Sequence, residues 1–188
     1  MIKTIVKITG KSPYCQSKHH DTPKLDKEGY EEHEKRTWRE RMHVNDKGNV
    51  VIPALAIKNC LSEAAKFLSV QIAGKGKATY TKHFEAGVLV VDNSDLGIKK
   101  ADVNSQSMFV PSSGRRGDGK RVTKYFPVMP QWGCTAEIFI LDETITKDVF
   151  LKHIEEAGKF IGLGSFRPRN NSIFGRFDVE LKSWEKVS

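Results

Sequence analysis

Residues 162–177 read Gly-Leu-Gly-Ser-Phe-Arg-Pro-Arg-Asn-Asn-Ser-Ile-Phe-Gly-Arg-Phe, and they join two segments of different periodicity. Upstream, apolar residues recur at helical spacing up to Ile161, in a helix that Thr146 or Asp148 could cap. From Ile173 to Trp184, apolar and charged residues alternate, as in a strand with one buried face. The stretch therefore predicts a loop between the last helix and the last strand of the fold.

This glycine–arginine loop carries several candidates for nucleic-acid binding. Glycine permits backbone angles that other residues avoid and lets another backbone approach closely. Arginine can fork onto phosphate oxygens, and an aromatic ring offers a flat face to a base. The candidates in the loop are Gly162, Gly164, Phe166, Arg167, Arg169 and Arg176. The alternative interpretation is a flexible turn whose arginines serve solubility.

The apolar segments outside the loop predict the fold. Residues 2–8 alternate as in a strand, and a helix enters at Pro53 and continues to Leu68. Residues 134–141 indicate a core strand, and residues 87–92 form an apolar run typical of a central strand. The order β–α–β–β–α–β predicts an α+β, ferredoxin-like and RRM-like fold, with a four-stranded antiparallel sheet and two helices on one face.

Two long insertions interrupt this order within a single domain of 188 residues. The first, about residues 12–47, is polar, densely charged and includes a possible surface helix from Glu28 to Met42. The second, about residues 93–131, contains a glycine-rich tip with a strong excess of lysine and arginine. Its segment 108–128 predicts a protruding, thumb-like basic hairpin.

The charge of the chain favours an anionic partner. The formal net charge is +8, which most commonly indicates nucleic acid. Aromatic residues beside basic ones suit a single strand, and we expect either Phe126 or Trp132, not both, to stack on bases. The basic candidates of the hairpin are Arg115, Arg116, Lys120, Arg121 and Lys124. A solvated tip without a ligand is the alternative.

Other classes of protein find little support in the sequence. No apolar run approaches the ~20 residues of a membrane span, and no signal-peptide pattern is present, so we expect a cytoplasmic protein without a membrane partner. Cys60 and Cys134 fall in core patterns. Cys15, His19 and His20 hint at a metal, but no second pair completes a site, so we expect no metal and no cofactor. No nucleotide-binding or hydrolase motif supports small-molecule catalysis.

Two segments resemble a known family when they are taken together. The segment from Gly158 to Arg167, with Gly175-Arg176-Phe177, resembles the C-terminal glycine-rich loop of the RAMP superfamily, the repeat-associated proteins of CRISPR effector complexes. The segment from Ile52 to Lys58 is similar to the start of the first helix in the backbone subunits of those complexes. Alanine stands at positions where that family often has glycine and serine, and the chain is short. A small phage or mobile-element relative therefore fits as well.

The resemblance implies an RNA-binding backbone subunit of an antiviral ribonucleoprotein. Such subunits polymerise head to tail along a single-stranded guide RNA, without catalysis, beside other effector subunits. It further implies that Lys58 contacts the RNA backbone and that Gly162, Gly164 and Arg167 belong to a loop that contacts phosphates. The 108–128 hairpin would be the thumb that separates segments of the guide.

Two other functions stay open at this point. Some RAMP relatives cleave RNA, and the loop with His19, His20 and Asp21 could form an endoribonuclease site with histidine as the general base. Adjacent histidines on a polar loop are more often solvated than catalytic, however. The other alternative is a phage accessory protein that binds DNA or another protein complex.

Overall fold

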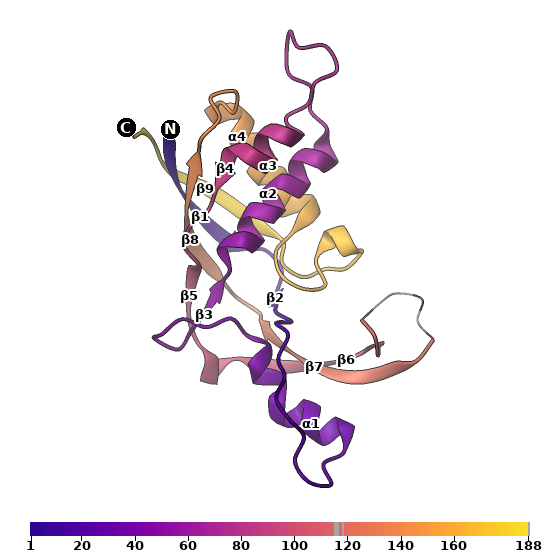
Figure 1. The fold of residues 1–188 in the computed structure, drawn as a ribbon. Helices are drawn as coiled ribbons and strands as arrows, with labels where there is room; N and C mark the ends of the chain where they lie inside the picture. Colours follow the sequence, from indigo (N-terminus) through magenta and orange to yellow (C-terminus); the bar gives the residue numbers. More distant parts are fainter. Residues whose placement is uncertain (115–116, 118, 188) are drawn as a thin grey trace.

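The main sheet has four antiparallel strands in the spatial order β4, β8, β1, β9, as predicted for the α+β, RRM-like fold class. The computed structural model describes residues 1–114, 117 and 119–187, so Arg115 and Arg116 lie outside the described residues. The strands are β4 (Val88–Leu89), β8 (Gly133–Ile140), β1 (Ile2–Gly10) and β9 (Phe177–Lys186). Figure 1 shows the sheet along one side of the molecule, with the helices packed on one of its faces.

The helices on this face are α2 (Ala54–Leu68), α3 (Thr81–Gly87) and α4 (Lys147–Glu156), and α4 continues as a π-helical turn, η3 (Ala157–Ile161). Thr146 caps α4, because its hydroxyl accepts a hydrogen bond from the Val149 amide. Pro53 precedes α2, and the first amide of that helix donates to the Asn93 side chain at 2.9 Å. Helix α3 has no counterpart in the predicted order, since its seven residues carry little apolar periodicity.

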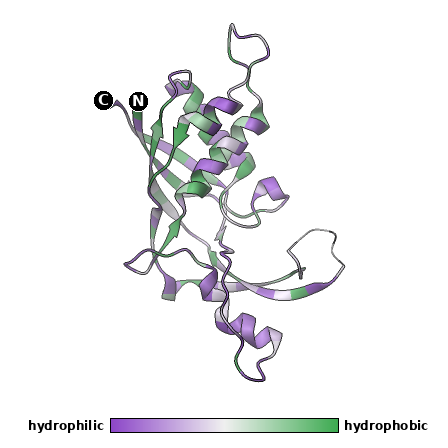
Figure 2. Cartoon of the chain, in the orientation of Figure 1, coloured by the Kyte–Doolittle hydropathy of each residue, from purple (hydrophilic) through white to green (hydrophobic). Residues whose placement is uncertain are grey.

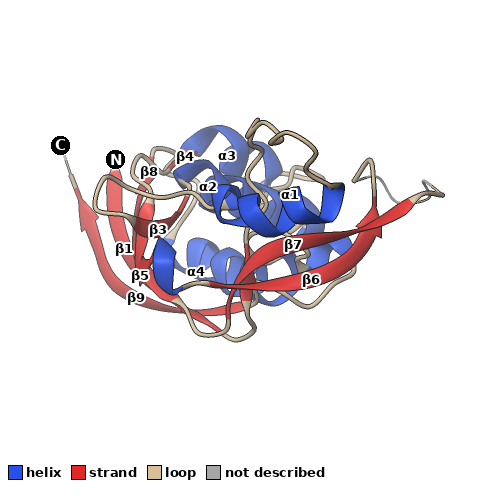
Figure 3. Cartoon of the chain, turned by 90° about the horizontal axis from the view of Figure 1, so that it is seen from below, coloured by secondary structure: helices blue, strands red, loops and turns tan. Residues whose placement is uncertain are grey.

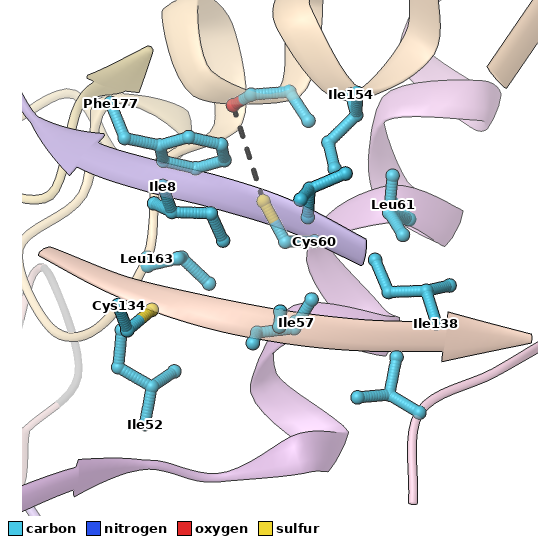
Figure 4. Close-up of a cluster of buried hydrophobic side chains, with 14 of the residues drawn as sticks. Ile8, Ile52, Ile57, Cys60, Leu61, Cys134, Ile138, Ile154, Leu163 and Phe177 are labelled. Atoms are coloured by element: carbon cyan, nitrogen blue, oxygen red, sulfur yellow. Dashed lines mark hydrogen bonds between the residues drawn. The ribbon is translucent and has the colours of Figure 1, made fainter. Parts of the chain in front are cut away.

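The core lies between the helices and the sheet. Alternate residues of the strands face inward, so that Ile8 of β1 and Ile138 of β8 are almost fully buried. They meet Ile57 and Leu61, which lie one helical turn apart on α2 (Figure 4). Burial of such a contiguous cluster supplies most of the favourable free energy of folding.

The apolar run at residues 87–92 is not the central strand that its composition predicts. Its strand, β4, has two residues and pairs only with β8 at the edge of the sheet. Val88 and Val90 are buried, whereas Leu89 and Val91 are 43% and 59% exposed. The run therefore buries one side only, as expected of an edge strand rather than a central one.

The last strand also begins later than predicted, at Phe177 instead of Ile173. Gly175 has a φ of 76°, a left-handed conformation that interrupts extended structure. Ile173 lies before this turn and is 67% exposed. The turn thus separates the end of the glycine–arginine loop from β9.

The long insertions build a second layer at one end of the molecule (Figures 1 and 3). A three-stranded sheet runs in the order β2-β7-β6, and a two-stranded sheet pairs β3 with β5. The long β6–β7 pair extends away from the core as an antiparallel hairpin. The elements of this layer are β2 (Tyr14–Cys15), α1 (Tyr30–Thr37), η1 (Trp38–Arg41), β3 (Asn49–Ile52), β5 (Ser94–Lys99), η2 (Lys100–Asp102), β6 (Asn104–Pro111) and β7 (Arg121–Met129). A short helical turn, η4 (Pro168–Asn170), lies in the glycine–arginine loop.

A few apolar side chains attach the polar first insertion to the rest of the fold. Figure 2 shows that α1 and its surroundings are largely hydrophilic. Tyr14, Trp38 and Met42 are nevertheless at most 6% exposed and belong to the main core cluster. Among the described residues, we find no helix with the length and apolar character needed to cross a bilayer.

Candidate nucleic-acid interface

A groove of about 1170 Å³ lies between the β6–β7 hairpin, the start of α2 and the glycine–arginine loop. It brings together segments that lie far apart in the sequence, including Ala56 and Asn59 of α2. No carboxylate is among the described residues that line it, whereas five cations are. These cations are Arg41, Arg121, Lys124, Arg167 and Arg169. The groove therefore has the charge of an anion-binding surface.

The glycines of the loop serve close packing inside the protein. Gly164 has a φ of 79°, and a Cβ at this position would lie 2.3 Å from the Cys15 carbonyl oxygen. The next amide, that of Ser165, donates to the same carbonyl at 2.8 Å. Gly162 is similarly tight, because a Cβ there would lie 2.6 Å from Cδ of Pro168. The close backbone approach at Gly164 thus joins the loop to β2.

Both arginines at the centre of the loop contact one carboxylate of α2. Arg167 lies 2.9 Å and Arg169 3.1 Å from the two oxygens of Glu63. All three side chains are partly exposed, and the Arg169 guanidinium also lies 6.0 Å from the ring centre of Phe67. One negative charge therefore holds two positive ones at the edge of the groove, which leaves this part of it with a net positive charge.

The hairpin contributes cations whose described hydrogen bonds go to backbone carbonyls. Arg121 donates to the carbonyl of Phe109 at 2.6 Å and lies over the ring of the same residue, 5.3 Å from its centre. Lys124 donates to the carbonyl of Ser112 at 3.3 Å. Because neutral carbonyls do not cancel their charge, Arg121 and Lys124 keep their attraction for a phosphate. Lys120 is exposed and lines a neighbouring cleft.

The aromatic residues of the groove form a small cluster of their own. Phe126 is 4% exposed, and Phe166 meets its ring edge to face at 4.9 Å. Phe166 has a φ of 55°, an uncommon backbone conformation for a bulky residue, and it packs on Phe174 as well. The guanidinium of Arg41 lies 5.3 Å from the ring centre of Phe126, while its Nη2 donates to both oxygens of Glu34.

Trp132 is a core residue, contrary to its predicted place in the binding surface. It is 6% exposed, its rings pack against Tyr14 and Phe177, and its indole N–H donates to the carbonyl of Ser12 at 2.7 Å. Its rings are therefore packed inside the protein and its N–H already has a hydrogen-bond partner, so neither is available to a base.

Three further predicted residues lie outside the groove. Lys58 donates to the Ser62 hydroxyl at 2.9 Å and to the Glu85 carbonyl at 2.6 Å, so its ammonium group joins α2 to α3. Arg176 donates to the carbonyl of Lys159, in the π-helical turn. Gly162 follows that turn and is not among the residues that line the groove. For these residues a contact with RNA stays a prediction.

The outer face of the main sheet is a poor match for the RNA surface of RNA-recognition motifs, which stack bases on sheet aromatics. Charged pairs cover much of it, among them Lys3 with Glu137 at 2.7 Å. Lys11 pairs with Asp178 at 3.0 Å near the start of β9. Because these opposite charges are paired, they offer a polyanion less attraction than the groove does.

The predicted histidines lie around the neighbouring cleft. His19 lies 2.9 Å from Asp21, with both side chains at least 86% exposed. His20 lies 3.1 Å from the Thr22 hydroxyl, and His33, which the sequence did not single out, donates through its Nε2 to the Thr22 carbonyl at 2.8 Å. Within the described ranges, no three histidine, cysteine or acidic side chains gather in a way that could hold a metal ion.

The cysteines are packing residues. Cys60 and Cys134 are buried, as predicted, and so is Cys15. Burial raises the pKa of the Cys60 thiol to about 12, and that of Cys15 to about 12 as well. A thiol with such a pKa is a poor nucleophile and a poor metal ligand near neutral pH. The Cys60 thiol instead donates to the Gly162 carbonyl at 3.4 Å, which ties α2 to the start of the loop.

The sequence signals for the site were uneven. Arg41 and Glu63 shape the groove but escaped prediction, because each sits in a helical segment whose charges look like a solvated face. Their partners Glu34 and Arg167 lie 7 and 104 positions away, and only the fold brings the second pair together.

No protein-family model matches this chain, and no curated protein matches it. Solved structures do. A chain in the structure of the Type III-B Cmr-beta complex bound to cognate target RNA has a TM-score of 0.54 and 13% identity, covering 97% of this chain and 60% of its own length. Cmr6 from Pyrococcus furiosus has a TM-score of 0.51 and 12% identity, covering 95% of this chain and 98% of its own.

This chain thus spans 60% of the length of the Cmr-beta subunit that it matches, and nearly the whole of Cmr6. At such low identity the likeness concerns the fold. The predicted resemblance to RAMP proteins is therefore confirmed at that level: this chain has the fold of Cmr6 and of a subunit of the Type III-B Cmr-beta complex.

Proposed function

We propose that this protein is a single-stranded RNA-binding subunit of a CRISPR-type ribonucleoprotein, of the non-catalytic backbone type. The observation that carries the proposal is the groove, where five cations and no carboxylate line the described surface between the hairpin and the glycine–arginine loop. The fold shared with subunits of the Cmr type, one of them in a complex with target RNA, supports it.

The groove suits a single strand better than a duplex. Its cations lie on two walls, with Arg121 and Lys124 on the hairpin and Arg167 and Arg169 on the loop, so that one strand would follow the cleft between them. Phe166 is partly exposed, lines the groove and packs on the buried Phe126, so its ring offers apolar contact to a base. The hairpin then has the role of a thumb that separates the segments of the guide.

Charge reversal on the hairpin tests the proposal. In the variant Arg121→Glu/Lys124→Glu, we expect the protein to lose co-purified RNA and to bind a labelled single-stranded RNA more weakly. The slope of log affinity against log salt should become shallower by about 1.4, since each phosphate contact on a single strand contributes ~0.7. Fluorescence anisotropy over a salt series, with single-stranded DNA of the same sequence beside the RNA, provides the measurement.

The matched control is Lys75→Glu/Lys77→Glu, which makes the same change of charge on the exposed loop between α2 and α3. This control should bind RNA with an unchanged salt slope. Equal loss in both variants would mean that only the net charge matters, and tighter binding of DNA than RNA would favour the phage accessory alternative. Cleavage of the labelled RNA by the wild-type protein would refute the non-catalytic role.

The backbone role includes assembly of several copies along one strand. We expect the purified protein to be small without RNA and to form larger particles whose mass grows with the length of the added RNA. Size-exclusion chromatography with light scattering measures this, and one copy per RNA regardless of its length would contradict polymerisation.

A further inference from the structure

A second cleft of about 730 Å³ lies beside the groove, between the hairpin and the first insertion. Three histidines line it, His19, His20 and His33, together with Tyr30, several cations and one carboxylate, that of Glu34. The rings of His20 and His33 are stacked with their centres 6.4 Å apart, and Thr22 contacts both through its hydroxyl and its backbone carbonyl. Two imidazoles are thus held side by side by one residue.

The second cleft and the groove share two of their lining cations, Arg41 and Lys124. Arg41 is fixed between them, because Glu34 binds its Nη2 at 2.8 and 3.0 Å while Phe126 lies against its guanidinium. Lys120 lines the second cleft but not the groove. A strand that leaves the groove past these shared cations therefore enters a surface that is also positive.

We infer that this histidine cleft is a second binding site for the same nucleic-acid strand, in which His20 and His33 contact a phosphate when protonated, so that RNA binding strengthens as the pH falls. The inference rests on the proposed function. The exposed Tyr30, 41% accessible, offers this site an aromatic face for a base.

The charges that face the two histidines support a site for an anion. Glu34 is engaged by Arg41 and is 5% exposed, so its charge is largely neutralised. Glu40, which also acts on His20, is paired with Lys100 at 2.9 Å. Asp21 contacts the outermost histidine, His19, rather than the stacked pair. The cations that line the cleft are Lys24 and Arg41 on the first insertion and Lys120 and Lys124 on the hairpin.

The free protein should keep His20 neutral near pH 7. Desolvation and the nearby Arg41 guanidinium lower the pKa of His20. A bound phosphate opposes both effects by supplying a negative charge, so that binding and proton uptake favour each other. The coupling therefore acts in the pH range where histidine ordinarily titrates.

The test compares RNA affinity at different pH values in wild type and in His20→Gln/His33→Gln. For wild type we expect affinity to rise about 3- to 10-fold from about pH 8 to about pH 6, as two partly exposed charge contacts would give. The double variant should match wild type at the higher pH and lose this rise. His83→Gln, which removes a histidine bound to Asp142 outside the cleft, should keep the rise.

A second variant keeps the inference testable if the double variant is unstable. Lys120 is exposed and lines only the histidine cleft, so Lys120→Gln should fold normally and make the salt slope shallower by about 0.7. An unchanged pH dependence in the double variant, or an unchanged salt slope in Lys120→Gln, would overturn the inference. Either result would leave the groove intact as an RNA site, whereas RNA binding that survives Arg121→Glu/Lys124→Glu would overturn the proposed function itself.

Discussion

Glu63 limits how much of the loop's positive charge faces the groove, and its removal gives a quantitative test. The carboxylate contacts Arg167 at 2.9 Å and Arg169 at 3.1 Å, and it is 29% exposed. A phosphate that binds either arginine must share it with this carboxylate. In Glu63→Gln the amide keeps the shape of the side chain but releases the charge of both arginines.

The size of the effect follows from the number of freed contacts. If only the net charge of the groove counts, the variant gains one cation, and the log–log salt slope steepens by ~0.7. If both arginines bind phosphates, the slope steepens by ~1.4. The folding cost should be small, because partly exposed ion pairs contribute about 0–1 kcal/mol each.

Fluorescence anisotropy with single-stranded RNA over a salt series measures this slope. We expect Glu63→Gln to bind more tightly at low salt and to lose affinity faster as salt rises. Glu85→Gln, an exposed carboxylate on α3, is the control and should leave the slope unchanged. If Glu63→Gln binds more weakly with a shallower slope, the carboxylate positions the arginines for RNA instead of competing with it, and the reasoning fails.

Two further predictions concern the scaffold. Gly164→Ala should lower the free energy of unfolding by about 2–4 kcal/mol, because the left-handed backbone is strained by a side chain and the new Cβ clashes with Cys15. The control Gly74→Ala has a φ of 75° but open space around it, so it should show only the strain of about 1 kcal/mol. Equal losses in thermal or denaturant unfolding would contradict the tight packing of the loop. Burial lowers the pKa of His153 in the folded protein. As the pH drops below about 6.5, this histidine is therefore protonated in the unfolded chain before it is protonated in the folded one, and the stability of the fold should fall. The non-titrating variant His153→Gln should flatten this fall in urea unfolding, and a slope identical to wild type would assign the pH dependence to other groups.

The fold could be predicted where local patterns and tertiary packing agree. The helix after Pro53 and the strand at 134–141 follow directly from the spacing of their apolar residues, and both lie where predicted. The run at 87–92 misled because apolar composition alone does not distinguish an edge strand from a central one. That distinction depends on which neighbours cover the strand, and β4 has a neighbour, β8, on one side only.

The candidate site could be predicted in part, for a related reason. Arg121, Lys124 and Arg167 stand in locally basic sequence, so composition alone indicated them. Trp132 was predicted from its nearness in sequence to that basic stretch, yet the fold places it against Tyr14. Charge density in a segment is visible in the sequence, but the direction of each side chain is decided by contacts with distant residues.

The glycine–arginine loop connects the scaffold to the proposed RNA site. Gly164 approaches Cys15 so closely that no side chain fits between them, and the Ser165 amide seals the contact. This contact holds the loop against β2, the strand that pairs with β7 of the hairpin. The two basic walls of the groove are therefore fixed to one another through β2. The spacing of phosphates that the groove accepts thus depends on a glycine that need not touch RNA.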